Sequence, residues 1–189
     1  MTAQMTNTVI YLDKPFSLVG CQGSELFDPN QHGLKTRMIS TGCWLGYHCT
    51  YLVADGQLYL NAVYAGLESA DSEAVQRGEG PRLFGALPVY NEEAACHVYQ
   101  VQEKYAFSGT MILGADLDYA SFTAASMGMG PAVWNYKEVH ELEFKEGTLV
   151  NSQDVSELQA QVRAQMKAGG GLFGMLRPPE NPQQADKVG

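Results

Sequence analysis

Glu138 and His140 are the residues whose types and spacing best fit acid/base chemistry. Two residues apart in a strand, they share one face, where a carboxylate beside an imidazole can take up and release protons. The loop before them, with Met127, Met129 and Pro131, would border a pocket. One hypothesis is therefore a small-ligand-binding protein or an enzyme with a pocket near Met127–Pro131 and His140. The alternative is that the pair lies on the solvated face of a sheet.

The pairs His48-Cys49 and Cys96-His97 look like half-sites for a metal ion. Adjacent strand residues point to opposite faces, so neither pair can supply both of its members to one ion. Cys43 and Cys49 have the same parity, but six residues of strand would separate them by about 20 Å. The sequence thus predicts no metal site, and the cysteines fit small buried apolar residues.

The other sequence patterns typical of catalysis and cofactor binding do not occur. The chain has no Gly-x-Ser-x-Gly elbow, and neither cysteine beside a histidine has the sequence context of a catalytic thiol. The glycines at 20–23 and 128–130 lack the strand–loop–helix setting of a phosphate site. No catalytic residue and no cofactor is predicted, and these patterns favour a protein without catalytic activity.

The chain of 189 residues is acidic, with 21 Asp and Glu against 12 Lys and Arg and a formal charge of −9. Nucleic-acid backbones and anionic membranes repel a negative surface, so neither is an expected partner. The charge favours a basic protein partner; the alternative is that it only keeps the chain soluble. The acidic residues expected to meet such a partner are Glu68, Asp71, Glu73, Glu79, Glu92 and Glu93.

The N-terminal residues 1–6 hold neither a basic segment nor an apolar run, so no secretory signal is expected. No stretch approaches the ~18 apolar residues of a membrane-spanning helix. Four cysteines are too few for a fold built on disulfides and fit reduced thiols. We therefore expect a cytoplasmic protein, and the sequence leaves its oligomeric state open.

Two hairpins are the clearest elements, because Asp55-Gly56 and Glu146-Gly147 each lie between two strand-like runs. A type I′ turn needs positive φ at both central residues, which favours such dipeptides. The flanking strands are predicted at residues 44–53, 57–64, 134–144 and 148–150.

Other strands are less sharply marked. They are predicted at residues 8–12, 82–90, 97–101 and 106–113. The last two are expected to pair with each other, and Lys14-Pro15 is expected to end the first. Residues 68–80 are expected to form an exposed loop, and the spacing after Asp116 allows a short helix.

Residues 154–167 are predicted to form the one clear helix. Asp154 can cap it, with Glu157 three residues later. Its apolar residues recur at helical spacing and form one face, namely Val155, Leu158, Val162 and Met166. Three glycines follow, and they favour a helix end.

The predicted fold is α+β: mainly an antiparallel curved β-sheet of about seven to nine strands with one C-terminal helix. Residues 1–168 are expected to form a single β-rich globular domain, and residues 169–189 a flexible C-terminal tail.

Ser40-Thr41-Gly42-Cys43-Trp44-Leu45-Gly46-Tyr47 and the later Asp55-Gly56-Gln57-Leu58-Tyr59-Leu60 carry a family resemblance. With Phe107-Ser108-Gly109 and the segment 127–150, they make residues 36–150 similar to a loosely defined group of uncharacterised bacterial proteins. The chain departs from the group at Leu45, where a basic residue is expected, and in its acidic segment at 68–80.

Some small proteins of this look are partners of bacterial toxins. The resemblance therefore implies a non-enzymatic protein-binding domain, most concretely an immunity or antitoxin protein that neutralises a basic partner such as a toxin. It implies no catalytic residue.

Overall fold

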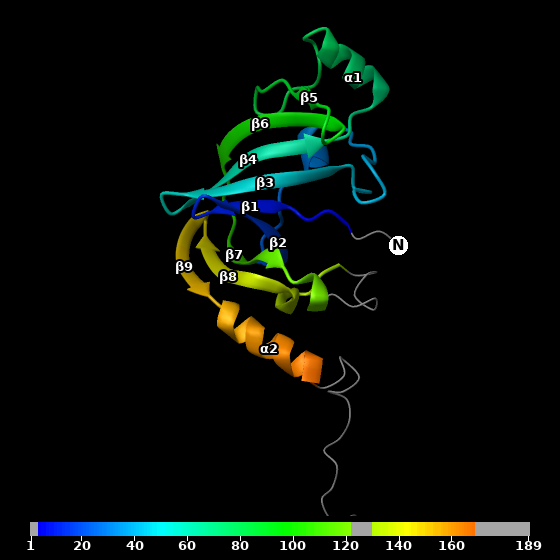
Figure 1. The fold of residues 1–189 in the computed structure, drawn as a ribbon. Coiled ribbons are helices and arrows are strands. Elements are labelled where there is room, and N and C mark those ends of the chain that lie inside the picture. The colour runs from blue at the N-terminus through cyan, green and yellow to red at the C-terminus, as the bar shows by residue number, and fades with distance from the viewer. Residues whose placement is uncertain (1–3, 122–129, 169–189) are drawn as a thin grey trace, which may run out of the picture.

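The computed structural model describes residues 4–121 and 130–168, which form one nine-stranded sheet with helices α1 and α2 at opposite ends of the molecule (Figure 1). The predicted α+β fold, with its mainly antiparallel sheet and C-terminal helix, is confirmed. The predicted tail, 169–189, lies outside the described residues. The strands are β1 (Thr8–Tyr11), β2 (Lys14–Gly23), β3 (Tyr47–Ala54), β4 (Gln57–Ala65), β5 (Val89–Asn91), β6 (Cys96–Lys104), β7 (Gly109–Leu117), β8 (Tyr136–Lys145) and β9 (Thr148–Asp154). The helices are α1 (Ser69–Gln76) and α2 (Ser156–Ala168), with short 3-10 turns η1 (Pro29–His32), η2 (Tyr119–Ser121) and η4 (Val133–Asn135).

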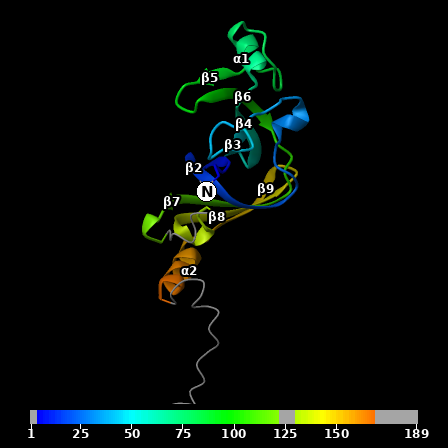
Figure 2. The ribbon, with the colours of Figure 1, turned by 90° about the vertical axis from the view of Figure 1, so that its right-hand side faces the viewer.

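The sheet curves until it closes on itself. Its strand order is β3-β1-β2-β7-β8-β9-β4-β6-β5, and β3 also pairs with β4, so the strands from β3 round to β4 make a ring. β1 and β3 are parallel, whereas the other neighbours are antiparallel. β6 and β5 continue beyond the ring toward α1, as both views show (Figures 1 and 2).

Alternate residues of the ring strands fill the core, as the two-residue period of a strand requires. On β8, for example, Leu142 and Phe144 are buried, whereas Glu141 and Glu143 are exposed. The largest fully buried side chains include Phe16, Tyr51, Leu58, Leu60, Tyr99, Phe107, Met111 and Leu113.

Both predicted hairpins are confirmed. Asp55 and Gly56 join β3 to β4 with φ of 51° and 70°, and Glu146 and Gly147 join β8 to β9 with φ of 51° and 79°. Positive φ at both central residues is the type I′ geometry, which follows the right-handed twist of the strands.

A third hairpin of the same kind has no glycine. Leu12 and Asp13 have φ of 50° and 59° and join β1 to β2. Lys14 and Pro15 therefore begin a strand, and the prediction that they end one is wrong. Pro15 is the second residue of β2 and lies beside the turn. Proline, which has no N–H to donate, is tolerated at the start of a strand.

The prediction that residues 97–101 and 106–113 pair with each other is wrong. β6 lies between β4 and β5, and β7 lies between β2 and β8. The connection between them has Phe107 buried in the core, and the backbone N–H of Gly147 donates to its carbonyl oxygen. A buried aromatic residue thus anchors the segment that leaves one strand for a distant part of the sheet.

The prediction of a loop over residues 68–80 is wrong as well, because Ser69–Gln76 form α1. None of the eight residues of α1 is buried, so the helix carries no apolar stripe that a sequence pattern would reveal. At Asp116, β7 continues to Leu117, and the allowed helix is reduced to η2. The rest of that candidate helix, residues 122–127, lies outside the described residues.

Helix α2 begins two residues later than predicted, at Ser156. Asp154 Oδ1 accepts a hydrogen bond from the Ser156 N–H at 2.9 Å, but the first helical bond runs from the Gln159 N–H to the Val155 carbonyl oxygen, so Val155 occupies the cap position and Asp154 precedes it. On the predicted apolar face, Val155, Val162 and Met166 are half-buried, whereas Leu158 is exposed. No helix in the described ranges has the length and apolar content to cross a membrane.

Candidate functional site

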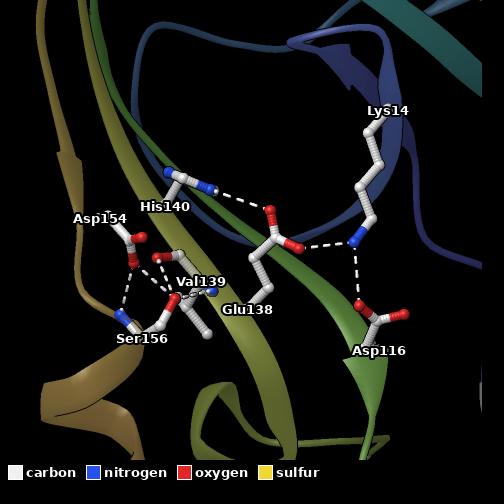
Figure 3. A network of polar contacts seen from close by, with 7 residues as sticks. All are labelled: Lys14, Asp116, Glu138, Val139, His140, Asp154 and Ser156. Carbon is white, nitrogen blue, oxygen red and sulfur yellow. Dashed lines mark hydrogen bonds and ion pairs between the residues drawn. The ribbon is translucent and has the colours of Figure 1, made fainter.

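Lys14, Asp116, Glu138 and His140 meet where β2 and β8 begin and β7 ends (Figure 3). Lys14 Nζ lies 2.9 Å from Asp116 Oδ2 and 2.5 Å from Glu138 Oε2. The other carboxylate oxygen of Glu138, Oε1, lies 3.2 Å from His140 Nε2. The structure thus brings together the predicted pair, Glu138 and His140, and adds two residues that were not predicted.

The strand register places this group. Glu138 and His140 stand opposite Ala115 and Leu113 of β7, and β7 is the strand between β8 and β2. Asp116 has a positive φ of 56°, which departs from extended geometry just where its carboxylate meets Lys14. Residues from three adjacent strands therefore converge at one end of the ring.

His140 is only 9% exposed. Two aromatic rings make T-shaped contacts with its imidazole, with centroid distances of 5.5 Å to Tyr11 and 5.3 Å to Phe16. These contacts fix the ring orientation in which Nε2 faces Glu138. The histidine is thus part of the packed interior, with one polar contact to the carboxylate.

The charges of the group stabilise one another. Hydrogen bonding to Lys14 lowers the pKa of Glu138, and the same lysine lowers the pKa of Asp116. Hydrogen bonds to Glu138 and Asp116 raise the pKa of Lys14. A carboxylate that is held ionised in this way is a weak proton acceptor near neutral pH. These properties are those of an ion pair that joins strands, and they do not favour acid/base catalysis.

A second polar group lies beside the first, at the start of α2 (Figure 3). The Ser156 hydroxyl donates to Asp154 Oδ1 at 2.5 Å, and it accepts a hydrogen bond from the Val139 N–H at 2.9 Å. Hydrogen bonds from Ser156 lower the pKa of Asp154. This group pairs the first N–H of α2 and fixes the start of the helix to β8.

The pocket predicted near His140 is not shown by the described residues. Met127 and Met129 lie outside them. A surface hollow of about 410 Å³ lies elsewhere, between β2 and the start of β3, and His140 is not among its lining residues. It is lined mainly by apolar side chains, including Leu18, Phe27 and Tyr47.

The six acidic residues predicted to meet a partner do gather at one end of the molecule. Four lie in or beside α1 and two in the turn between β5 and β6, and both views show α1 and β5 at the same end (Figures 1 and 2). Asp71 is half-buried, whereas the other five are exposed: Glu68, Glu73, Glu79, Glu92 and Glu93. Only Arg77 and Arg82 carry positive charge in residues 66–96. We call residues 68–79, which include α1, together with residues 89–93 the acidic end.

Strand β5 is the last strand in the order, and among the described strands it pairs only with β6. Val89 is 72% exposed and Tyr90 53% exposed. The Tyr90 ring packs against the buried His97 ring at a steep angle, with 5.2 Å between the ring centroids. The acidic end thus combines charge, apolar surface and an unpaired strand edge.

The cysteines are free thiols, and three of them are buried. Burial raises the pKa of Cys49 to about 12 and that of Cys96 to about 11, so neither is a reactive thiolate at neutral pH. Within residues 4–121 and 130–168, no three His, Cys, Asp or Glu side chains come close enough to hold a metal ion.

Sequence reasoning found Glu138 and His140 through their two-residue spacing but missed Lys14 and Asp116. The sequence holds a weak signal for Lys14, because it stands two residues before the buried Phe16 and therefore lies on the same face of β2. No known family model, curated protein or solved structure matches the chain.

Proposed function

We propose that the chain is a non-enzymatic protein-binding domain whose acidic end binds a basic protein partner. The resemblance to partners of bacterial toxins gives the proposal its concrete form, an immunity or antitoxin protein that neutralises a basic toxin. The observation that supports it is that five exposed carboxylates lie at the same end of the molecule as β5, whose outer edge is unpaired among the described strands.

A free strand edge presents unpaired N–H and C=O groups, so an extended segment of another protein can add to the sheet there. Val89 and Tyr90 would supply apolar contacts, and Glu92 and Glu93 would pair with Lys or Arg of the added segment. Exposed carboxylates also attract a basic partner before contact and speed the encounter.

A synthetic peptide that alternates valine with lysine tests this surface, with a valine–glutamate peptide for comparison. We expect the lysine peptide to bind at the acidic end, the glutamate peptide not to bind there, and the affinity for the first to fall as salt is added. The variant Glu73→Gln, Glu79→Gln, Glu92→Gln, Glu93→Gln should slow association and flatten the salt dependence.

A matched control removes equal charge elsewhere, at the exposed residues Glu25, Glu103, Glu141 and Glu143. If both fourfold variants weaken binding equally, net charge alone attracts the peptide, and the acidic end is not a binding site. To test the immunity function, the protein encoded beside this chain is expressed in cells alone and together with this chain. If the neighbouring protein alone stops growth and this chain does not restore it, the immunity function is contradicted.

A further inference from the structure

The loop between η1 and β3 has the opposite charge to the acidic end. No acidic residue stands between Asp28 and Asp55, whereas Lys35 and Arg37 both do. Both side chains are exposed, and within the described residues neither forms an ion pair. A protein with a net negative charge thus presents a local basic surface.

The same loop exposes large apolar side chains. Trp44 is 67% exposed, Leu45 is 73% exposed and Met38 is more than half exposed. Met5, whose N–H donates to the Gly42 carbonyl oxygen of the loop, is also more than half exposed. Single exposed apolar residues are ordinary, but a group rimmed by polar residues marks an interaction site. Trp and Arg are also among the residues that contribute most at protein interfaces.

Hydrogen bonds and close backbone contact hold the loop, independently of those side chains. The Thr36 hydroxyl donates to the Leu45 carbonyl oxygen at 3.0 Å. Gly46 has a φ of 78°, and a Cβ there would lie 2.4 Å from the Arg37 carbonyl oxygen, so the loop backbone at Gly46 touches the backbone at Arg37. The basic and apolar side chains are therefore carried on a fixed backbone, which reduces the entropy lost on binding.

The surface hollow of about 410 Å³ begins beside this loop, because Leu45 and Met5 belong to its lining. Leu18, Leu26 and Phe27 also line it. Its size and mainly apolar lining suit one or two bulky apolar side chains of a ligand.

We propose that this surface binds an acidic segment of another protein that carries a bulky apolar residue. Carboxylates of the segment pair with Lys35 and Arg37, its apolar side chain enters the hollow beside Leu45, and Trp44 packs over it. Charge complementarity selects an acidic occupant, because Lys35 and Arg37 are exposed and no acidic residue stands between Asp28 and Asp55. The inference is independent of the proposed basic partner, since it concerns a surface of the opposite charge.

The probe is a short fluorescent peptide that alternates glutamate with leucine and phenylalanine, and its counterpart with serine in place of glutamate is the control. Fluorescence anisotropy with the full chain should show that the glutamate peptide binds. This binding should depend on the intact loop surface. Leu45→Ser, and separately Lys35→Glu with Arg37→Glu, should each weaken that binding by about tenfold or more. Val89→Ser removes an equally exposed apolar side chain from β5, and it should leave the affinity unchanged.

Four results would overturn the proposal. The first is no binding, or equal loss in Leu45→Ser and Val89→Ser. The second is a dimer of the wild type that Leu45→Ser converts to a monomer, because a second copy would then be the occupant. The third is peptide binding that appears only in Leu172→Ser, Phe173→Ser, because the chain's own C-terminal segment would then cover the surface. The fourth is Leu45-dependent binding to anionic lipid vesicles without binding of the peptide. An unchanged Tm of Leu45→Ser shows in each case that the variant is folded.

Discussion

Lys14 Nζ and Glu138 Oε2 lie 2.5 Å apart although 124 residues separate them in the chain. The pair links β2 to β8 across the intervening β7, which contributes Asp116 as a second carboxylate on the same lysine. Three strands that are distant in sequence are therefore joined by charge at one end of the ring, beside the buried His140.

The first prediction concerns this ion pair and pH. Lys14 lowers the pKa of Glu138 and of Asp116, so both carboxylates bind fewer protons in the folded state than in the unfolded state near their pKa. The resulting stability is present above the ordinary carboxylate pKa of about 4 and is lost as pH falls through the lowered folded values. Lys14→Met should therefore be less stable than wild type at neutral pH, and the difference should shrink in acid.

Urea unfolding at pH 7 and at pH 3 measures this difference. Lys145→Met is the control, because Lys145 is an exposed β8 residue without an ion pair in the described part of the chain. A difference between Lys14→Met and wild type that is the same at both pH values would show that the lysine acts through packing instead.

The second prediction compares the two glycine turns. Gly56 and Gly147 have nearly the same φ, 70° and 79°, but an added Cβ meets nothing within 4 Å at Gly56 and lies 2.3 Å from the Tyr105 carbonyl oxygen at Gly147. Gly56→Ala should cost about 1 kcal/mol for the left-handed backbone alone. Gly147→Ala adds a backbone clash and should cost at least about 1 kcal/mol more. Equal losses in the free energy of unfolding would show that the turn relaxes away from Tyr105.

These turns also show how far the sequence predicts the fold. Asp55-Gly56 and Glu146-Gly147 are recognisable because glycine readily adopts positive φ. Leu12-Asp13 makes the same turn without glycine, so the β1–β2 hairpin has no local signal. Helix α1 buries none of its residues, so its sequence lacks the apolar period that indicates a helix.

The third prediction concerns a buried hydroxyl. The Phe27 N–H donates to the hydroxyl oxygen of the fully buried Tyr51 at 3.0 Å. Tyr51→Phe leaves that N–H without its partner and should destabilise the protein by about 1–3 kcal/mol. In Tyr105→Phe the lost bond, to the Glu25 carbonyl oxygen, is exposed, so water replaces it and the loss is smaller. Equal losses in urea unfolding would contradict the role assigned to burial.

The fourth prediction concerns the docking of α2. Arg163 Nη1 donates to the carbonyl oxygens of Trp134 and Tyr136 at 2.9 and 2.8 Å, whereas Leu158 of the same helix is 56% exposed. Arg163→Ala should destabilise by about 2 kcal/mol, and Leu158→Ala by less than about 0.5 kcal/mol. Hydrogen exchange measures this difference: the α2 amides should exchange faster in Arg163→Ala and at the wild-type rate in Leu158→Ala. The reverse order would mean that the apolar face predicted from sequence holds the helix.

The candidate site shows a different limit on what can be predicted from the sequence. The spacing of Glu138 and His140 predicts a shared face, and the structure places them in contact. Their environment depends on which strands become neighbours, and Lys14 reaches them only because β7 separates β2 from β8 by a single strand. That order follows from closure of the sheet, which no local pattern encodes. The same closure buries His140 against Tyr11 and Phe16 and makes it part of the core.

The last prediction concerns the four free thiols. Cys21 is exposed, whereas Cys43, Cys49 and Cys96 are buried, so a thiol reagent should modify one cysteine in the native protein and all four in urea. Partial burial raises the pKa of Cys21, so its reaction should be slower than that of a small free thiol and should accelerate as pH rises toward 9. Cys21→Ser should remove the native reaction and leave three thiols in urea. Rapid native modification of a second cysteine would show that the structure opens near that residue, since a thiol must reach solvent and ionise before it reacts.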